Sequence, residues 1–427
     1  MSKTQHRLIN TRAGSATSAK QQIPYVRIGR LIICFGLFLL IVQAPLVGAE
    51  AGMDPAKLKR IPVELRSFVE NDSIAGAVAL VARHGQIASL EAVGYSDIAN
   101  HKPMQADNLF WIASMTKPIT AAAVLMLQDE GKLSVEDPVE RYLPEFTNLW
   151  MIQEKVADRL VLVKAPRPIT LRDLLTHTSG LGDVSSPRPD VSLAELVMAY
   201  SQQPLHFAPG SRWEYSSSGI NTLGRIVEVV SGQRFQDFLQ ARLFKPLRMK
   251  NTTLYPTRNQ LQRLAKSYQP PDNGRGLEEV SIFLIKGGLA SRARTAMPAW
   301  GLFSTASDMS LFYQMMLDGG VFEGRRLLSA AAVEMMTRTQ TGTLETGWVE
   351  GMSFGLGFAV VKRPVGVTGM YSVGTFGHGG AYGTQSWADP KKDLILILMI
   401  QRAKMPNADN TGMRRAFQEA AVAAMVD

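Results

Sequence analysis

The sequence predicts an α+β fold in which a largely antiparallel sheet joins both ends of the chain and a helical region is inserted between its halves. Strand-like runs lie near the two ends, at 74–95, 354–361 and 394–400, whereas helical patterns fill the middle. No repeat, low-complexity tract or long linker follows residue 53, so one folded unit is expected there.

The individual elements follow from local patterns. The run 74–95 predicts two strands around a turn at His84-Gly85. A proline near the start, an alanine-rich run and Gly131 at the end predict a helix over 118–130. Other helices are expected at 224–230, 235–243, 308–317 (opened by Ser307 or Asp308) and 414–425. We expect the sheet to use about 53–120 and 290–427, and the helical region about 121–289.

The N-terminus has the pattern of a secretory signal. Residues 1–49 hold six basic residues and no acidic one, and an uninterrupted apolar run at 31–42 is followed by small residues. A basic flank, a short apolar core and small residues are typical of a cleaved signal, and the run is short for a membrane span. We therefore expect an exported protein with a domain at 50–427, periplasmic or secreted. The alternative is an uncleaved inner-membrane anchor.

Composition excludes several classes of function. Beyond residue 49 the chain holds 40 basic and 37 acidic residues, with no basic stripe, so no nucleic-acid partner is expected. The single cysteine, Cys34, lies in the apolar run, so cleavage of the signal would leave a mature chain without disulfides or cysteine-bound zinc. No phosphate-binding loop and no His-Glu-x-x-His pattern is present, so we expect no cofactor and no metal.

The strongest chemical motif is Ser114-Met115-Thr116-Lys117, the only Ser-x-x-Lys in the chain. It follows an aromatic stretch at 110–113 and opens the helix expected at 118–130. Residues three apart share a helix face, so Lys117 can direct its amine at the Ser114 hydroxyl. A lysine needs its pKa lowered by about three units to act as a base at neutral pH, and a tyrosinate held by that lysine is the alternative base.

A second serine competes for the role of nucleophile. Gly351-Met352-Ser353-Phe354-Gly355 matches the Gly-x-Ser-x-Gly elbow, which requires a strand before it and a helix after it. Here a strand-like run follows, and His378 precedes Asp389, the reverse of the order used by that fold. We therefore interpret Ser353 as part of a glycine-rich entry to an edge strand.

Taken together, three motifs resemble those of the serine β-lactamase and penicillin-binding-protein superfamily. Ser114-x-x-Lys117 resembles the first motif, Tyr215-Ser216-Ser217 the second and His378-Gly379-Gly380 the third, in the right order. The resemblance runs from about 74 to 401 and is nearest to the branch that holds class C β-lactamases, DD-peptidases, D-aminopeptidases and family VIII esterases. It implies a β-lactamase/DD-peptidase-like fold, with an antiparallel sheet flanked by helices and an all-helical region.

The resemblance also implies roles for individual residues. Ser114 would be acylated, Lys117 and Tyr215 would share the general-base work, and Tyr215 would protonate the leaving group. The amides of Ser114 and Ala381 would form the oxyanion hole. The strand that carries His378, Gly379 and Gly380 would line the site.

Two departures from the family pattern bear on the substrate. Ser217 stands where class C β-lactamases carry an asparagine, and His378 stands where they carry a lysine. A histidine is mostly neutral at pH 7, which weakens any contact with a substrate carboxylate. We therefore expect an ester, an amide or a D-amino-acid peptide as the small-molecule substrate, with esterase activity favoured.

Three alternatives remain: a cell-wall DD-peptidase or D-aminopeptidase, a weak β-lactamase, and a non-catalytic envelope binding module on the same fold. His177, which precedes Thr-Ser-Gly, is interpreted as a structural residue of a turn or core. We expect the loops at 183–190 and 269–292 to shape the pocket and thereby to select the natural substrate.

Overall fold

A computed structural model of the 427-residue chain describes residues 47–184, 190–272, 274–285 and 287–426. The predicted secretory signal lies outside these residues except for its last three, which belong to helix α1 (Val47–Glu50). Within the described ranges, no helix combines the length and the apolar character needed to cross a bilayer.

An eight-stranded antiparallel sheet forms the framework, in the order β12-β13-β14-β15-β16-β1-β2-β3. Its centre joins the two ends of the chain, because β1 pairs with β16 from Val78 opposite Met399 to Arg83 opposite Leu394. This confirms the predicted α+β fold. The strands are β1 (Gly76–Arg83), β2 (Gln86–Asp97), β3 (Lys102–Pro103), β12 (Met352–Phe354), β13 (Ala359–Val361), β14 (Phe376–Gly379), β15 (Gln385–Asp389) and β16 (Leu394–Met399).

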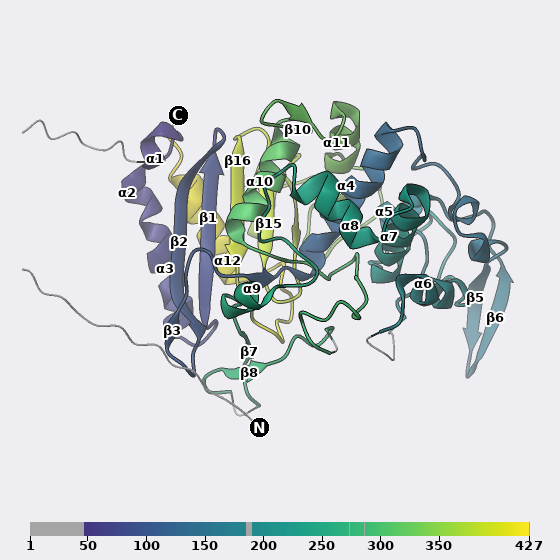
Figure 1. The fold of residues 1–427 in the computed structure, drawn as a ribbon, viewed down its shortest axis with the longest axis horizontal. Helices are drawn as coiled ribbons and strands as arrows, with labels where there is room; N and C mark the ends of the chain where they lie inside the picture. Colours follow the sequence, from purple (N-terminus) through teal and green to yellow (C-terminus); the bar gives the residue numbers. More distant parts are fainter. Residues whose placement is uncertain (1–46, 185–189, 273, 286, 427) are drawn as a thin grey trace, which may run out of the picture. The chain divides into compact units, whose positions relative to one another are not determined.

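Helices cover both faces of this sheet (Figure 1). Along β1, Val78 and Leu80 join one hydrophobic cluster, whereas the alternate residues Ala79 and Val81 join another. Because both faces are buried, the strand reads as a continuous apolar run. On one face lie α2 (Pro55–Leu58), α3 (Arg60–Glu70) and α12 (Gly412–Ala423), and on the other α10 (Ala306–Leu317).

A helical region occupies the middle of the chain (Figure 1). Its central helix is α4 (Thr116–Asp129), in which every residue from Thr116 to Leu127 is buried. The surrounding elements are α5 (Leu171–Leu175), α6 (Leu193–Ser201), α7 (Ser217–Ser231), α8 (Phe235–Leu239), a π-helix (Gln240–Phe244), α9 (Arg258–Gln262) and α11 (Ala330–Thr337). Short hairpins or paired segments are β4 (Phe110–Trp111) with β9 (Phe303–Ser304), β5 (Trp150–Val156) with β6 (Arg159–Lys164), β7 (Ser267–Gln269) with β8 (Glu278–Val280), and β10 (Val321–Phe322) with β11 (Arg325–Arg326).

Several predicted boundaries were wrong. The single strand expected at 354–361 is two strands, β12 and β13, because Gly357 adopts a φ of +86° and turns the chain between them. Helix α7 begins at Ser217, well before the expected 224, because the Ser216 side chain caps it by accepting a hydrogen bond from the Gly219 amide. The helix expected at 235–243 changes to π geometry after Leu239.

Two helix starts were also placed too late. Helix α10 begins at Ala306 with Thr305 as its N-cap, not Ser307 or Asp308, since the Thr305 hydroxyl accepts from the Asp308 amide. Helix α12 begins at Gly412, capped by Thr411, two residues before the expected start. In each case a hydroxyl group capped the helix earlier than the apolar pattern indicated.

Candidate active site

Ser114 lies in a short 3₁₀ turn (Ala113–Met115) between strand β4 and helix α4. The side chains of Ala113 and Met115 are buried, whereas Ser114 is partly exposed. Ala113 has a φ of +46°, a left-handed conformation that is uncommon for residues other than glycine. Such conformations concentrate at functional sites, where the surrounding structure holds them. The backbone therefore presents Ser114 outward on a rigid support.

Lys117 follows one turn later and is completely buried. Its Nζ atom lies 3.1 Å from Ser114 Oγ and 3.0 Å from the backbone oxygen of Ala299. Burial lowers the pKa of Lys117 to about 7, against the opposing effect of the Asp183 carboxylate. The predicted contact between the two side chains is thus present, and the lowered pKa leaves part of the amine neutral at pH 7.

The ring of Tyr215 packs against the Lys117 amine. The centre of the Tyr215 ring lies 4.6 Å from Lys117 Nζ, and the phenol oxygen is buried. No hydrogen bond of standard geometry joins that oxygen to a described residue, although Ser114 is close enough to lower the phenol pKa. Burial has the larger effect and raises the pKa of Tyr215 well above 10, so the phenol stays protonated at neutral pH.

The start of helix α7 positions Ser217. The Ser216 hydroxyl, besides capping the helix, donates a 2.7 Å hydrogen bond to the backbone oxygen of Leu181. Ser217 Oγ then lies 3.5 Å from Lys117 Nζ, at the long limit of a hydrogen bond. The structure therefore brings the residue expected to contact substrate to the buried amine.

His378 lies on β14 and is 3% exposed. Its Nδ1 atom lies 2.7 Å from the backbone oxygen of Gly379, which assigns the ring proton to Nδ1 as the donor. Among the described residues, Nε2 has no hydrogen-bond partner. Burial and the nearby charge of Lys117 lower the pKa of His378 to about 4, so the ring is neutral at pH 7.

Close packing explains why Gly379 and Gly380 follow His378. A Cβ atom on Gly379 would lie 1.9 Å from Asp409 Oδ1, and one on Gly380 would lie 2.6 Å from the backbone oxygen of Ile112. Glycine at 380 thus lets the turn after β14 approach the segment that leads into Ser114. Ala381 is exposed beside it, and its amide donates to no acceptor among the described residues. Its oxyanion role stays a prediction.

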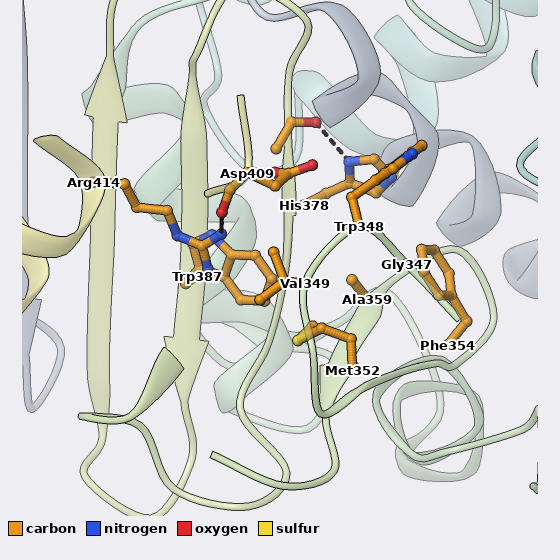
Figure 2. Close-up of a pocket in the computed structure, with 11 residues that line it drawn as sticks. Gly347, Trp348, Val349, Met352, Phe354, Ala359, His378, Trp387, Asp409 and Arg414 are labelled. Carbon is orange, nitrogen blue, oxygen red and sulfur yellow. Dashed lines mark hydrogen bonds between the residues drawn. The ribbon is translucent and has the colours of Figure 1, made fainter. Parts of the chain in front are cut away.

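A small cavity of about 20 Å³ adjoins His378 and Gly379 (Figure 2). This volume holds about one water molecule. Trp348 lies at the end near His378, and Asp409, Trp387 and Arg414 lie toward the other (Figure 2). The Arg414 side chain is buried, donates to the backbone oxygen of Asp409 at 2.6 Å and lies over the Trp387 ring. Trp387 pairs with Gly377 of β14, so this packing lies beside the strand that carries His378.

Comparison with known proteins identifies the family. Residues 64–420 match the model of the family described as Beta-lactamase. The chain belongs to this family. Esterase EstB of Burkholderia gladioli is 32% identical over 382 residues, covering 82% of this chain and 92% of EstB. Penicillin-binding protein 4 of Amycolatopsis lactamdurans is 32% identical over 316 residues, covering 73% of this chain and 76% of that protein.

A solved structure agrees with the β-lactamase-family fold. The structure titled "EstCE1, a hydrolase with promiscuous acyltransferase activity" has a TM-score of 0.71 at 24% identity, covering 86% of this chain and 99% of that one. The predicted membership in the β-lactamase and penicillin-binding-protein superfamily and the predicted fold are therefore confirmed. The chain is a hydrolase of the β-lactamase family, and relatives named both as esterases and as penicillin-binding proteins share it.

The rival serine has a different environment in this β-lactamase-family chain. Ser353 lies on β12, the edge strand of the sheet, and is 1% exposed. Its hydroxyl lies 3.1 Å from Thr341 Oγ1, and no lysine or histidine is hydrogen-bonded to it among the described residues. This geometry agrees with the interpretation of Ser353 as a strand residue.

The site also contains residues that sequence reasoning did not select. Ala299 supplies a backbone oxygen to Lys117, and Trp348 packs with its ring centre 4.4 Å from that of Tyr215. His177, interpreted as structural, contacts Tyr215 directly, with ring centres 4.5 Å apart. No motif marks the first two, and the Thr-His-Thr-Ser-Gly stretch was the only available indication of the third. In the part of the chain that the structure describes, no group of three or more potential ligands could hold a metal ion.

Proposed function

We propose that this protein is a serine hydrolase that cleaves carboxylic esters through an acyl-enzyme on Ser114. The observation that carries the proposal is the buried Lys117 amine, 3.1 Å from Ser114 Oγ, with a pKa of about 7. A hydroxyl requires a base to become a nucleophile, and a lysine serves only when its pKa is lowered. Here burial lowers it.

The two candidate bases differ in protonation. Lys117 is partly neutral at pH 7, whereas Tyr215 keeps its proton because burial raises its pKa well above 10. We therefore assign the base to Lys117: its nitrogen takes the Ser114 proton as Oγ attacks the substrate carbonyl carbon. Tyr215 donates its proton to the leaving alkoxide oxygen, and the Lys117 ammonium returns a proton to the phenolate.

The negative charge on the carbonyl oxygen needs donors, which are typically the largest catalytic contribution. The Ser114 and Ala381 amides are the proposed pair. The close approach of Gly380 to the backbone of Ile112 supports this assignment, because it places the turn after β14 beside the nucleophile. Water then attacks the acyl carbon, releases the acid and restores the Ser114 hydroxyl.

Esterase activity is favoured over β-lactamase activity by the state of His378. A neutral imidazole with a pKa of about 4 gives no fixed positive charge for a substrate carboxylate. The name of the relative EstB supports the same choice. The related penicillin-binding protein keeps the cell-wall peptidase as the second candidate.

The experiment compares wild type, Ser114→Ala and Ser353→Ala for hydrolysis of a p-nitrophenyl ester and labelling by a fluorophosphonate probe. We expect Ser114→Ala to abolish both and Ser353→Ala to retain both. Nitrocefin and a D-Ala-D-Ala peptide, assayed with the same samples, distinguish the alternatives. A folded wild type that reacts with no acylating probe would instead indicate the non-catalytic binding module.

A further inference from the structure

His177 holds the backbone on both sides of Tyr215. Its carbonyl oxygen accepts a 2.9 Å hydrogen bond from the amide of Glu214. Its side-chain Nδ1 accepts a second, of 3.2 Å, from the amide of Ser216. One residue therefore fixes the chain immediately before and immediately after Tyr215.

The imidazole also packs on the phenol ring itself. The two ring centres are 4.5 Å apart with planes at 36°, and the Phe354 ring packs edge-on against the imidazole at 5.4 Å. His177 is 1% exposed, so its neighbours leave it little room to move. Displacement of this ring would remove a wall against which the Tyr215 ring packs.

The backbone of His177 takes an unusual conformation to make these contacts. Its φ is +60°, in the left-handed region, just after helix α5 ends. Few residues other than glycine adopt this conformation, although asparagine, aspartate and histidine are enriched in it. Because Nδ1 accepts, the ring proton belongs on Nε2.

We propose that His177 is a positioning residue that holds the Tyr215 phenol in place for proton transfer. This inference rests on the proposed function, in which Tyr215 protonates the leaving group. His177 itself contacts neither Ser114 nor Lys117 through a hydrogen bond among the described residues, so its influence passes through Tyr215.

Two substitutions separate the side chain from the backbone. His177→Gly keeps the left-handed turn but removes the ring and the acceptor. His177→Asn keeps the turn and places an amide oxygen near the position of Nδ1. We expect His177→Gly to lower kcat for an alkyl ester, whose alkoxide needs the Tyr215 proton to leave, by about 10- to 100-fold with KM changed less than about threefold, because misplaced catalytic groups reduce turnover. His177→Asn should recover most of that loss.

A double-mutant cycle with Tyr215→Phe tests whether His177 acts through Tyr215. Once the phenol oxygen is gone, His177→Gly should reduce kcat by no more than about twofold further. An equal loss in both backgrounds would overturn the inference, as would a His177→Gly variant with wild-type kcat. If His177→Gly does not fold, as judged by circular dichroism, His177→Phe replaces it in the same cycle, since it also lacks the acceptor.

Leu196→Ala is the packing control. Leu196 is a buried residue of α6 and belongs to the hydrophobic cluster that also contains the buried side chains of α4 and α7. It should lower the melting temperature while kcat stays within about twofold of wild type. Failure of the proposed function can be told apart from failure of this inference. A wild type that neither hydrolyses esters nor is labelled at Ser114 would refute the function itself, whatever the His177 variants do.

Discussion

The Lys117 amine lies 3.1 Å from the Ser114 hydroxyl oxygen and 3.0 Å from the backbone oxygen of Ala299, fully removed from solvent. A charged amine is poorly solvated there, so burial favours its neutral form. The same burial that costs stability therefore supplies a base. The surroundings of Lys117, and of His378 and Gly379 on strand β14, lead to four predictions.

The first prediction concerns pH. Lys117 accepts a proton only when neutral, and its pKa is about 7. We expect kcat/KM for a neutral ester to fall by about tenfold per pH unit below about 7 and to level off above it. Measured pH profiles of wild type and His378→Gln check this. The substitution should leave the midpoint of the acidic limb unchanged. A midpoint that shifts in His378→Gln would contradict the assignment of Lys117 as the base.

The second prediction concerns stability. Folding lowers the pKa of Lys117 from 10.5 to about 7, so between these pH values the unfolded chain binds more protons and wild-type stability rises with pH. Keeping the buried Lys117 amine, or its neutral form, at neutral pH in place of a solvated ammonium lowers the free energy of unfolding by up to about 5 kcal/mol. Lys117→Met should abolish hydrolysis and raise the free energy of unfolding at pH 7 by about 1–3 kcal/mol, since lost hydrogen bonds offset part of the gain.

Denaturant unfolding across that pH range is the measurement. The rise of stability with pH should be smaller in Lys117→Met than in wild type. A variant less stable than wild type, with an unchanged pH dependence, would show that the buried amine is not the origin of the cost.

The third prediction concerns substrate charge. His378 is neutral at pH 7, with a pKa of about 4. His378→Lys should therefore raise the kcat/KM ratio of nitrocefin, which carries a carboxylate, to a neutral ester by about tenfold, or about 1.4 kcal/mol. His378→Gln is the neutral control and should leave the ratio near that of wild type. Equal ratios in all three proteins would show that charge at this position does not select the substrate.

The fourth prediction concerns Gly379. A methyl group there would lie 1.9 Å from Asp409 Oδ1 and 2.6 Å from Gln385 Nε2. Gly379→Ala should displace the Asp409 carboxylate and the Gln385 amide and break the 2.9 Å hydrogen bond between them, lowering kcat by about tenfold and stability by about 1–3 kcal/mol. Gly412→Ala is the matched control, because no heavy atom lies within 4 Å of its Cβ position. It should leave kcat unchanged. Full activity in Gly379→Ala would refute the tight packing of β14.

Local sequence patterns were sufficient for the framework and for the first motif. Apolar residues on both faces of β1 and an alanine-rich α4 specify their own secondary structure, and the three-residue spacing alone places Lys117 beside Ser114. Predicting that Tyr215 and His378 join this site required the family resemblance, because no local pattern indicates that segments so distant in sequence meet in the fold.

Tertiary contacts account for what was missed. The left-handed turn at His177 and its two hydrogen bonds to the Tyr215 segment depend on a fold that no short pattern encodes. The break between β12 and β13 depends on Gly357, which has a positive φ and where a Cβ atom would lie 2.4 Å from Ala121 Cβ. In both cases a partner remote in sequence determines the local conformation.

The most direct test of the proposed function is to identify the acylated residue. Wild-type protein mixed rapidly with a p-nitrophenyl ester and quenched in acid would be digested, and the acyl group located by peptide mass spectrometry. We predict an acyl adduct on Ser114 and on no other serine. An adduct on Ser353, or ester hydrolysis with no adduct on either serine and no loss in Ser114→Ala, would contradict the account.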